Sequence, residues 1–194
     1  PPPSLVQEDV GWRVEFRSME LQFTEFENAA FSVFVTLLAK AILYYDMNLY
    51  IPISKVDANF HRAHRRDSAR KEKFWWRSCC GSGSDKDSEL NLVQLSMKEI
   101  MCGNETCMGL IEIVRKYLRE VVALNADTEE YAIIDGYLRL IEQRSKSKLL
   151  TPAQWLREFV DKHPDYKHDS TLNQSICRDI VDAVRDINSG DMKA

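Results

Sequence analysis

The sequence predicts an α+β fold that is mostly helical, with one strand or a few strands of an antiparallel sheet at its start. Three observations lead to this prediction. Residues 11–17 alternate strictly between apolar and charged side chains, which is the period of a strand. Most later segments repeat apolar residues at helical spacing instead. Only seven glycines and six prolines occur in 194 residues, which argues against fibrous and disordered chains.

The strand at residues 11–17 is expected to place its apolar side chains on one face and its charged side chains on the other. On the charged face, Glu15 lies between Arg13 and Arg17. A carboxylate can bind Mg²⁺ and a guanidinium can pair with phosphoryl oxygens, so this face suits a site for a metal ion and a phosphate. A solvated strand face with weak ion pairs is the alternative. The apolar alternation shifts by one residue afterwards, which predicts a bulge or a strand end near Arg17 and Ser18.

The first helix is expected to begin after Thr24, because Thr24 and Glu27 have the spacing of a capping box. Residues 29–45 are apolar almost all round, except at Ser32, Thr36 and Lys40. A membrane span would need about 20 apolar residues, and this run is shorter. The preferred interpretation is a buried central helix, and no membrane partner is expected.

A second helix is expected to start at a Ser54 cap and to run toward Arg70. It is strongly basic, and the aromatic cluster 74–76 follows it. Phosphate contacts and base stacking would suit a nucleic acid. However, Asp67 and Glu72 interrupt the basic run, and the whole chain has a net charge of −4. A solvated helix face followed by core aromatics is therefore preferred, with no nucleic-acid partner.

Residues 78–91 are rich in Gly, Ser and charged side chains and predict a flexible surface loop inside one domain. The rest is expected to be helical. Thr151 followed by Pro152 places a capping residue before a proline at the first helical position. The segment 163–166 should end that helix. The other expected helices are a short one at 95–101 and longer ones at 109–122, 128–144 and 173–187.

Composition places the chain among ordinary soluble globular proteins, with 44% hydrophobic and 29% charged residues. Its five cysteines are few and odd in number, which favours a reducing, cytoplasmic location over a disulfide framework. Cys102 and Cys107 lack the spacing of a zinc site. The chain begins with Pro1 and has no signal-peptide pattern, so it is expected to be a piece of a longer chain.

Several blocks of the sequence resemble the C-terminal half of the catalytic subunit of eukaryotic glutamate–cysteine ligases. The first is GWRVEFR at residues 11–17, followed by Met19-Glu20 and by Phe26-Glu27-Asn28. Three further blocks carry the resemblance: IPISKVD at 51–57, WLREF at 155–159 and HPDYK at 163–167. The resemblance identifies residues 1–194 as a C-terminal portion of the ligase catalytic domain.

This resemblance implies an ATP-dependent ligase that joins the γ-carboxylate of L-glutamate to the amine of L-cysteine, the first step of glutathione biosynthesis. The γ-carboxylate attacks ATP to form an acyl phosphate, which the amine then opens. The resemblance also implies that Glu15 is a Mg²⁺ ligand. It further implies that Arg17 contacts phosphoryl oxygens and serves as both the catalytic and the ATP-binding residue. In the whole enzyme, a glutamine-synthetase-like antiparallel sheet is expected to curl round the substrates.

The other metal-binding carboxylates of the family lie in its N-terminal half, which this piece lacks. The piece alone is therefore expected to be inactive and to need that half as a partner, and a regulatory subunit is a further candidate partner. The alternative is a non-catalytic helical interaction module related to the ligase.

Overall fold

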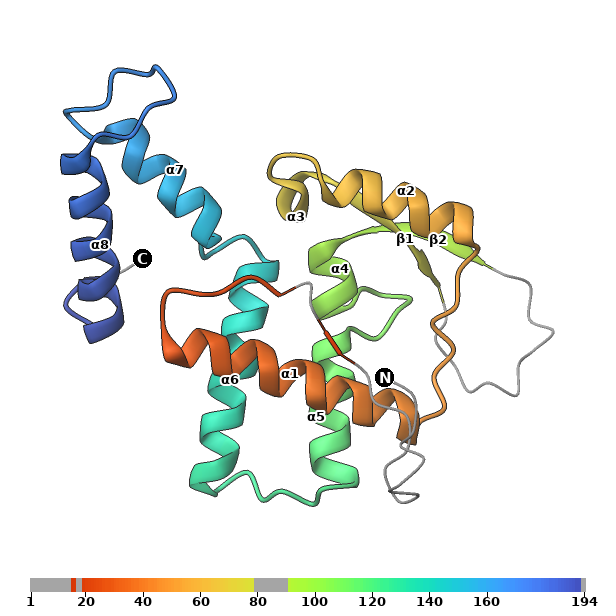
Figure 1. The fold of residues 1–194 in the computed structure, drawn as a ribbon. Coiled ribbons are helices and arrows are strands. Elements are labelled where there is room, and N and C mark those ends of the chain that lie inside the picture. The colour runs from red at the N-terminus through yellow and green to blue at the C-terminus, as the bar shows by residue number, and fades with distance from the viewer. Residues whose placement is uncertain (1–14, 17–18, 79–90, 193–194) are drawn as a thin grey trace, which may run out of the picture.

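The structure of the protein is a computed structural model that describes residues 15–16, 19–78 and 91–192. This part of the chain is mostly helical with one two-stranded antiparallel sheet (Figure 1), which agrees with the predicted α+β class. The elements are α1 (Glu25–Tyr44), α2 (Ile53–Ala63), α3 (Ser68–Lys71), β1 (Lys73–Arg77), β2 (Leu92–Ser96), α4 (Met97–Cys102), α5 (Leu110–Glu120), α6 (Glu129–Ser145), α7 (Pro152–Lys162) and α8 (Gln174–Ser189).

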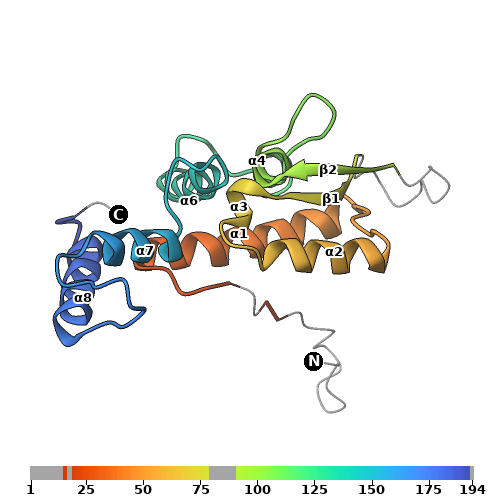
Figure 2. The ribbon, with the colours of Figure 1, turned by 90° about the horizontal axis from the view of Figure 1, so that it is seen from above.

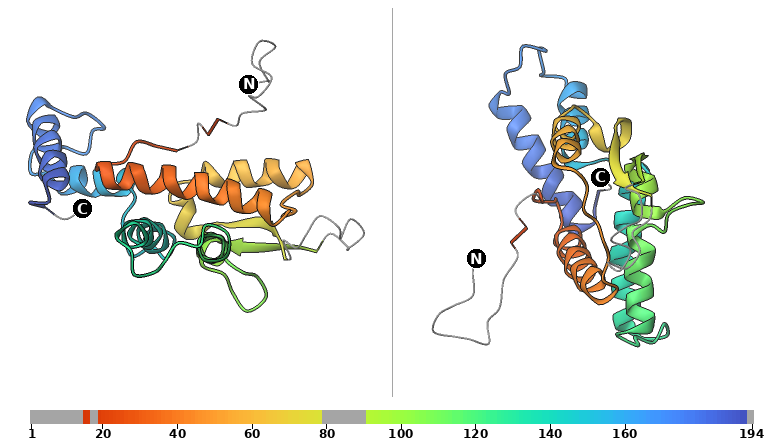
Figure 3. Two further views of the ribbon diagram at one scale, coloured as in Figure 1. Left: turned by 90° about the horizontal axis from the view of Figure 1, so that it is seen from below. Right: turned by 90° about the vertical axis from the view of Figure 1, so that its right-hand side faces the viewer.

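The helices α1 and α2 form one side of the molecule, and the β1–β2 hairpin with α4, α5 and α6 forms the other (Figures 2 and 3). The main core lies between these sides. Its buried residues come from six elements, and they are Phe34, Ala41, Phe74, Leu95, Ile100, Leu110, Ile111, Ile113, Val114, Leu118, Leu138 and Ile141. A smaller core around Trp155 joins α7 to α8 at one end of the molecule.

Helix α1 begins as the sequence predicts, with Thr24 and Glu27 forming a capping box. Its one buried face, which includes Phe34 and Ala41, packs against α5 and α6. By length and composition alone α1 could cross a membrane, and 22% of its apolar window is buried inside the structure. Ser32 and Thr36 lie on its exposed side, where each hydroxyl donates to a backbone carbonyl four residues earlier. The expectation of a buried central helix is thus confirmed for one face only.

The second predicted helix is broken in two. Pro52, not Ser54, is the N-cap of α2, which ends at Ala63, and the separate short helix α3 follows. Asp67 adopts a left-handed conformation with φ of 62° just before α3. A right-handed helix cannot pass through such a residue, which is why the predicted run toward Arg70 was wrong.

The described strands are not at the start of the chain but in its middle, where β1 pairs antiparallel with β2 and Trp75 lies opposite Gln94. The aromatic cluster 74–76 forms most of β1, and the predicted helix at 95–101 begins instead at Met97, after β2. Residues 79–90 of the predicted flexible loop lie outside the described residues. At its ends, the backbone N–H of Ser78 donates to the carbonyl of Asn91 at 2.9 Å.

Helix α2 covers the edge of β1 with its polar side. The amide of Asn59 imitates a neighbouring strand: its Nδ2 donates to the Trp75 carbonyl at 3.0 Å, and its Oδ1 accepts from the Trp75 N–H at 2.7 Å. Arg62 donates to the carbonyl of Lys73 at 2.7 Å, and the ammonium of Lys55 lies 4.1 Å from the centre of the Trp75 ring. These contacts satisfy backbone groups that an edge strand would otherwise expose.

The four remaining helix predictions are confirmed within one or two residues. Thr128 caps α6, Thr151 caps α7 with Pro152 at its first position, and Asn173 caps α8. Helix α7 ends at His163, as the segment 163–166 predicts.

Replacing Asn59 by Ala should destabilise the fold by roughly 1–3 kcal/mol, because two backbone groups of Trp75 lose their partner at once. Asn188→Ala is the matched control: it makes the same change in a helix, at an exposed position of α8, and should stay within about 0.5 kcal/mol of the original protein. Urea unfolding followed by circular dichroism measures both. Equal stability of the two variants would show that the amide does not hold the strand edge.

Candidate functional site

The structure describes only part of the motif that the sequence singles out. Glu15 and Phe16 are exposed and lie in no strand, whereas residues 11–14 and Arg17 lie outside the described residues. The predicted strand is therefore not found at the two positions that can be checked. A strand needs a neighbour to accept its backbone hydrogen bonds, and within the described residues β1 and β2 pair only with each other.

The segment that follows the motif is fastened to the start of α1. The side chain of Asn28 accepts from the Gln22 N–H at 3.0 Å, and its Nδ2 donates to the carbonyls of Gln22 and Thr24 at 3.2 and 2.8 Å. Residues 22–24 are thereby held against the first turn of α1. Asn28 belongs to one of the blocks of the resemblance, but sequence reasoning gave it no structural role.

A buried ion pair joins the same turn of α1 to the end of α6. Nη2 of Arg144 lies 2.5 Å from Oε1 of Glu27, and both side chains are 11% exposed. The second oxygen of Glu27 accepts from the Thr24 N–H at 3.3 Å, and Arg144 also donates to the carbonyl of Leu150. One carboxylate therefore both caps α1 and neutralises the arginine of α6.

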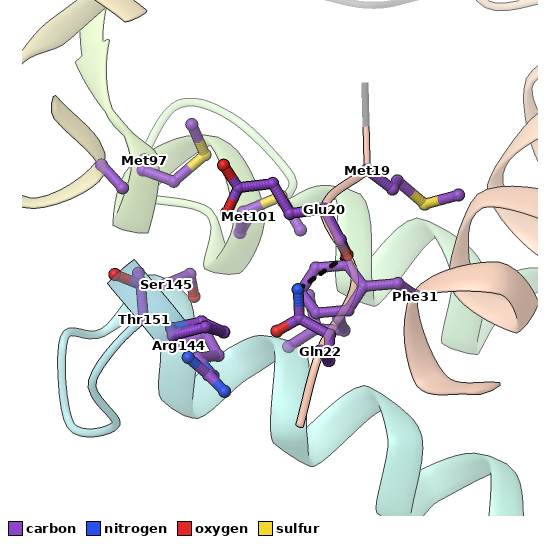
Figure 4. A pocket seen from close by; sticks show the side chains of 12 residues that line it. Met19, Glu20, Gln22, Phe31, Met97, Met101, Arg144, Ser145 and Thr151 are labelled. Atoms are coloured by element: carbon purple, nitrogen blue, oxygen red, sulfur yellow. Dashed lines mark hydrogen bonds between the residues drawn. The ribbon is translucent and has the colours of Figure 1, made fainter. Parts of the chain in front are cut away.

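A pocket of about 330 Å³ lies between residues 19–22, α1, α4 and α6 (Figure 4). This volume is within the range of small-molecule sites. Most of the lining is apolar and rich in methionine. The lining residues are Met19, Glu20, Gln22, Phe31, Ala69, Met97, Met101, Ile141, Arg144, Ser145, Thr151 and Pro152.

Two buried polar atoms of this pocket lack a hydrogen-bond partner among the described residues: Oε1 of Gln22 and Nε of Arg144. They offer one acceptor and one donor. Because Glu27 neutralises Arg144, the pocket has no net positive charge with which to attract a triphosphate. Its lining suits an amphipathic group that carries no phosphate.

Charged side chains near the pocket form ion pairs with each other. Arg115 lies between Asp135 and Glu142, at 3.3 and 3.5 Å. The hydrogen bond from Lys146 is the main reason that the pKa of Glu142 is lowered from its ordinary value. The ion pairs of Arg115 with both acids join α5 to α6.

A second pocket, of about 320 Å³, lies where α7 meets the turn before α3. Gln154 donates to Asp67 at 2.7 Å, and Lys71 lies 3.5 Å from the same carboxyl group. Three basic and three acidic residues line this pocket together with Gln154, so their charges balance and give the pocket no preference for an anion. These charged residues are Arg66, Asp67, Lys71, Arg157, Glu158 and Asp161.

The basic run that raised the nucleic-acid alternative makes contacts within the chain. Arg65 pairs with Glu72 at 3.1 Å, and Arg62 and Lys55 lie over the ring of Trp75. Phe74 is buried in the main core, and Trp76 packs against it. Phe74 and Trp76 thus agree with the interpretation as core aromatics, whereas Lys55 and Arg62 face β1 and do not form a solvated face.

No group of three His, Cys, Asp or Glu side chains that could hold a metal ion is found within residues 15–16, 19–78 and 91–192. The described residues do not by themselves fit Mg²⁺, which takes about six oxygen ligands. Glu15 therefore stays a predicted ligand whose companions are not within this part of the chain.

Comparison with known proteins decides the family. Residues 1–187 match the family model described as glutamate–cysteine ligase. The chain belongs to the glutamate–cysteine ligase family. Among curated glutamate–cysteine ligases, it is 44% identical to that of Schizosaccharomyces pombe, a match covering 98% of this chain and 28% of the relative. It is 38% identical to that of Dictyostelium discoideum (98% and 30%) and 40% identical to the human catalytic subunit (91% and 29%).

This member of the glutamate–cysteine ligase family thus spans about three-tenths of the length of the curated relatives it matches. The resemblance seen in the sequence blocks is confirmed. Sequence reasoning missed Arg144 as a site-forming residue, because its partner Glu27 lies 117 positions earlier and no local spacing connects them.

Replacing Arg144 by Met should cost about 3–5 kcal/mol of stability, because Glu27 would remain buried without its cation. The double variant Glu27→Gln/Arg144→Met should recover part of this loss. Arg139→Met is the control, since the Arg139 side chain is 72% exposed in its pair with Asp135 and should change stability by at most about 1 kcal/mol. Urea unfolding measures all three, and equal losses in the two single variants would contradict a buried pair.

Proposed function

We propose that this chain forms part of an ATP- and Mg²⁺-dependent ligase that makes γ-glutamylcysteine from L-glutamate and L-cysteine, the first step of glutathione biosynthesis. The observation that carries the proposal is the family match over residues 1–187. Nothing in the comparisons favours the non-catalytic alternative. A cytoplasmic location is part of the proposal and rests on the low, odd number of cysteines.

In this proposal, the γ-carboxylate of glutamate attacks the γ-phosphate of ATP and releases ADP. The amine of cysteine then attacks the resulting acyl phosphate, loses a proton and displaces inorganic phosphate. Arg17 neutralises charge on the transferred phosphoryl group, which is the main way proteins catalyse such transfers. Glu15 supplies one carboxylate to Mg²⁺, and the other ligands come from ligase polypeptide outside this chain.

The described geometry supports this assignment in two ways. Glu15 is exposed on the segment before α1, so polypeptide from another part of a ligase could approach it. Residues 22–24, further along that segment, are fixed against the first turn of α1 by Asn28 and by the capping box, so the segment leaves α1 from a defined point.

The test uses a full-length ligase in which this chain replaces the matched stretch of the Schizosaccharomyces pombe relative. Arg17→Ala should lower turnover by about 10²–10³-fold, the range for removing one charge-stabilising group. Glu15→Gln should raise the Mg²⁺ concentration needed for half-maximal activity by at least about tenfold. ATP-dependent formation of γ-glutamylcysteine is measured by mass spectrometry.

Glu105→Gln is the matched control, because it removes an exposed acid on the connection between α4 and α5. Its turnover should equal that of the parent ligase. Unchanged turnover and Mg²⁺ dependence in both Glu15→Gln and Arg17→Ala would refute these site residues.

The 194-residue chain alone should show no turnover with ATP, Mg²⁺, glutamate and cysteine. The reason is that its described residues assemble no metal site. Product formation by the purified chain above a heat-denatured control would contradict this expectation.

A further inference from the structure

Helix α2 turns its polar side toward the sheet and its apolar side away from it. Lys55, Asn59 and Arg62 follow one another at helical spacing, and all three contact β1. None of the eleven residues of α2 is buried. This is the reverse of the usual arrangement, in which an amphipathic helix packs its apolar stripe on the core.

The apolar stripe of α2 consists of Ile53, Val56, Phe60 and Ala63, which are spaced i, i+3, i+7 and i+10. Ile53 is 74% exposed and Phe60 is 60% exposed. At 100° per residue, Ile53 and Phe60 lie about 120° and 100° round the helix axis from Asn59, so these two side chains face away from β1, whereas Val56 and Ala63 lie on the flank between. In Figure 2 the far side of α2 has no other described helix or strand against it.

We propose that the α2 apolar stripe is a docking surface for ligase polypeptide outside the matched stretch. This inference rests on the proposed function, because it takes the chain to work within a full-length ligase. Relatives carry about seven-tenths of their length outside the match, which is ample polypeptide to cover an exposed helix. The proposal is the same whether that polypeptide is continuous with this chain or separate from it.

The stripe has the anchor spacing with which amphipathic helices bind apolar grooves. The partner surface is therefore an apolar groove, with Ile53 and Phe60 as its two main anchors. A second copy of this chain is a poorer occupant, because one three-turn helix face offers a few hundred square ångströms, against roughly 1,200 Å² for a stable dimer. An anionic lipid surface is poorer too, because Lys55 and Arg62 are directed at Trp75 and β1 instead of flanking the stripe.

The test variant is Ile53→Asp/Phe60→Lys. Each new charge lies at the helix end where the helix dipole favours it, so α2 itself should remain folded. The matched control is Leu172→Asp/Val181→Lys, which places the same two charges at exposed apolar positions in and before α8. Circular dichroism melting should give similar transition temperatures for both variants and the original chain.

Each chain, carrying an affinity tag, is co-expressed with the Schizosaccharomyces pombe ligase polypeptide that lies outside the matched stretch. The original chain and the control should retain this polypeptide on the affinity resin. Ile53→Asp/Phe60→Lys should retain at least about tenfold less, since two apolar anchors are replaced by charges that burial would penalise.

Equal retention by the two variants would overturn the proposal, and so would absence of retention by the original chain. Two other results would also overturn the proposal. One is that the original chain forms dimers in sedimentation velocity and Ile53→Asp/Phe60→Lys abolishes these dimers. The other is that the original chain binds vesicles of phosphatidylcholine and phosphatidylserine and the same variant abolishes this binding. The retained complex is assayed for ATP-dependent γ-glutamylcysteine. A complex that forms through α2 but makes no product would refute the proposed function and leave the docking surface intact.

Discussion

The buried pair of Glu27 and Arg144 is the contact on which the arrangement of α1, α6 and residues 19–24 depends. Removing two charges from water is costly, so such a pair contributes more to a defined geometry than to net stability. Here the same carboxylate also accepts the Thr24 N–H. Glu27 therefore links the start of α1 to the end of α6, while Asn28 holds residues 22–24 beside them.

A consequence of this pair is the chemical character of the adjoining pocket. An arginine without its partner would make the methionine-rich cavity a site for anions. With Arg144 paired to Glu27, the polar atoms of this lining that lack a partner among the described residues are two neutral-type groups, the buried Nε of Arg144 and the buried Oε1 of Gln22. Because Glu27 cancels the charge of Arg144, this cavity does not attract phosphate groups.

The unusual orientation of α2 follows from the unpaired backbone groups at the edge of the sheet. A two-stranded sheet has two open edges, and a bare edge exposes backbone donors and acceptors. Asn59 supplies the hydrogen bonds that a third strand would give to Trp75, and this requires the polar side of α2 to face inward. The apolar stripe is left outside as a geometric result, not as a separate feature of the sequence.

Local chemistry was sufficient to predict most helix starts. Capping residues such as Thr24 and Thr151 act within one turn, so their signal is complete in four consecutive residues. The strands depend on distant residues: the run at 74–76 does not alternate, and its partner begins on the far side of the loop. The break at Asp67 was equally hidden, because a left-handed aspartate leaves no pattern in its neighbours.

The sequence was sufficient to name the candidate site residues but not to predict how they are arranged in space. Its residues, Glu15 and Arg17, came from the family resemblance, and the structure describes only the first of them. Three of the less exposed acids described elsewhere, Glu27, Asp135 and Glu142, are paired with arginines and stabilise helix contacts. A carboxylate committed to an arginine is a poor ligand for a metal ion, because the cation already neutralises it.

In the proposed site, the exposed segment before α1 carries the carboxylate of Glu15 to the metal ion. A Mg²⁺ site needs several oxygen ligands in near-octahedral geometry. Within the described residues no cluster provides them, so in the proposal the remaining ligands come from other ligase polypeptide, which needs a reason to lie close by. The outward apolar stripe of α2 gives such a reason, since covering it would bring other ligase polypeptide against this side of the molecule.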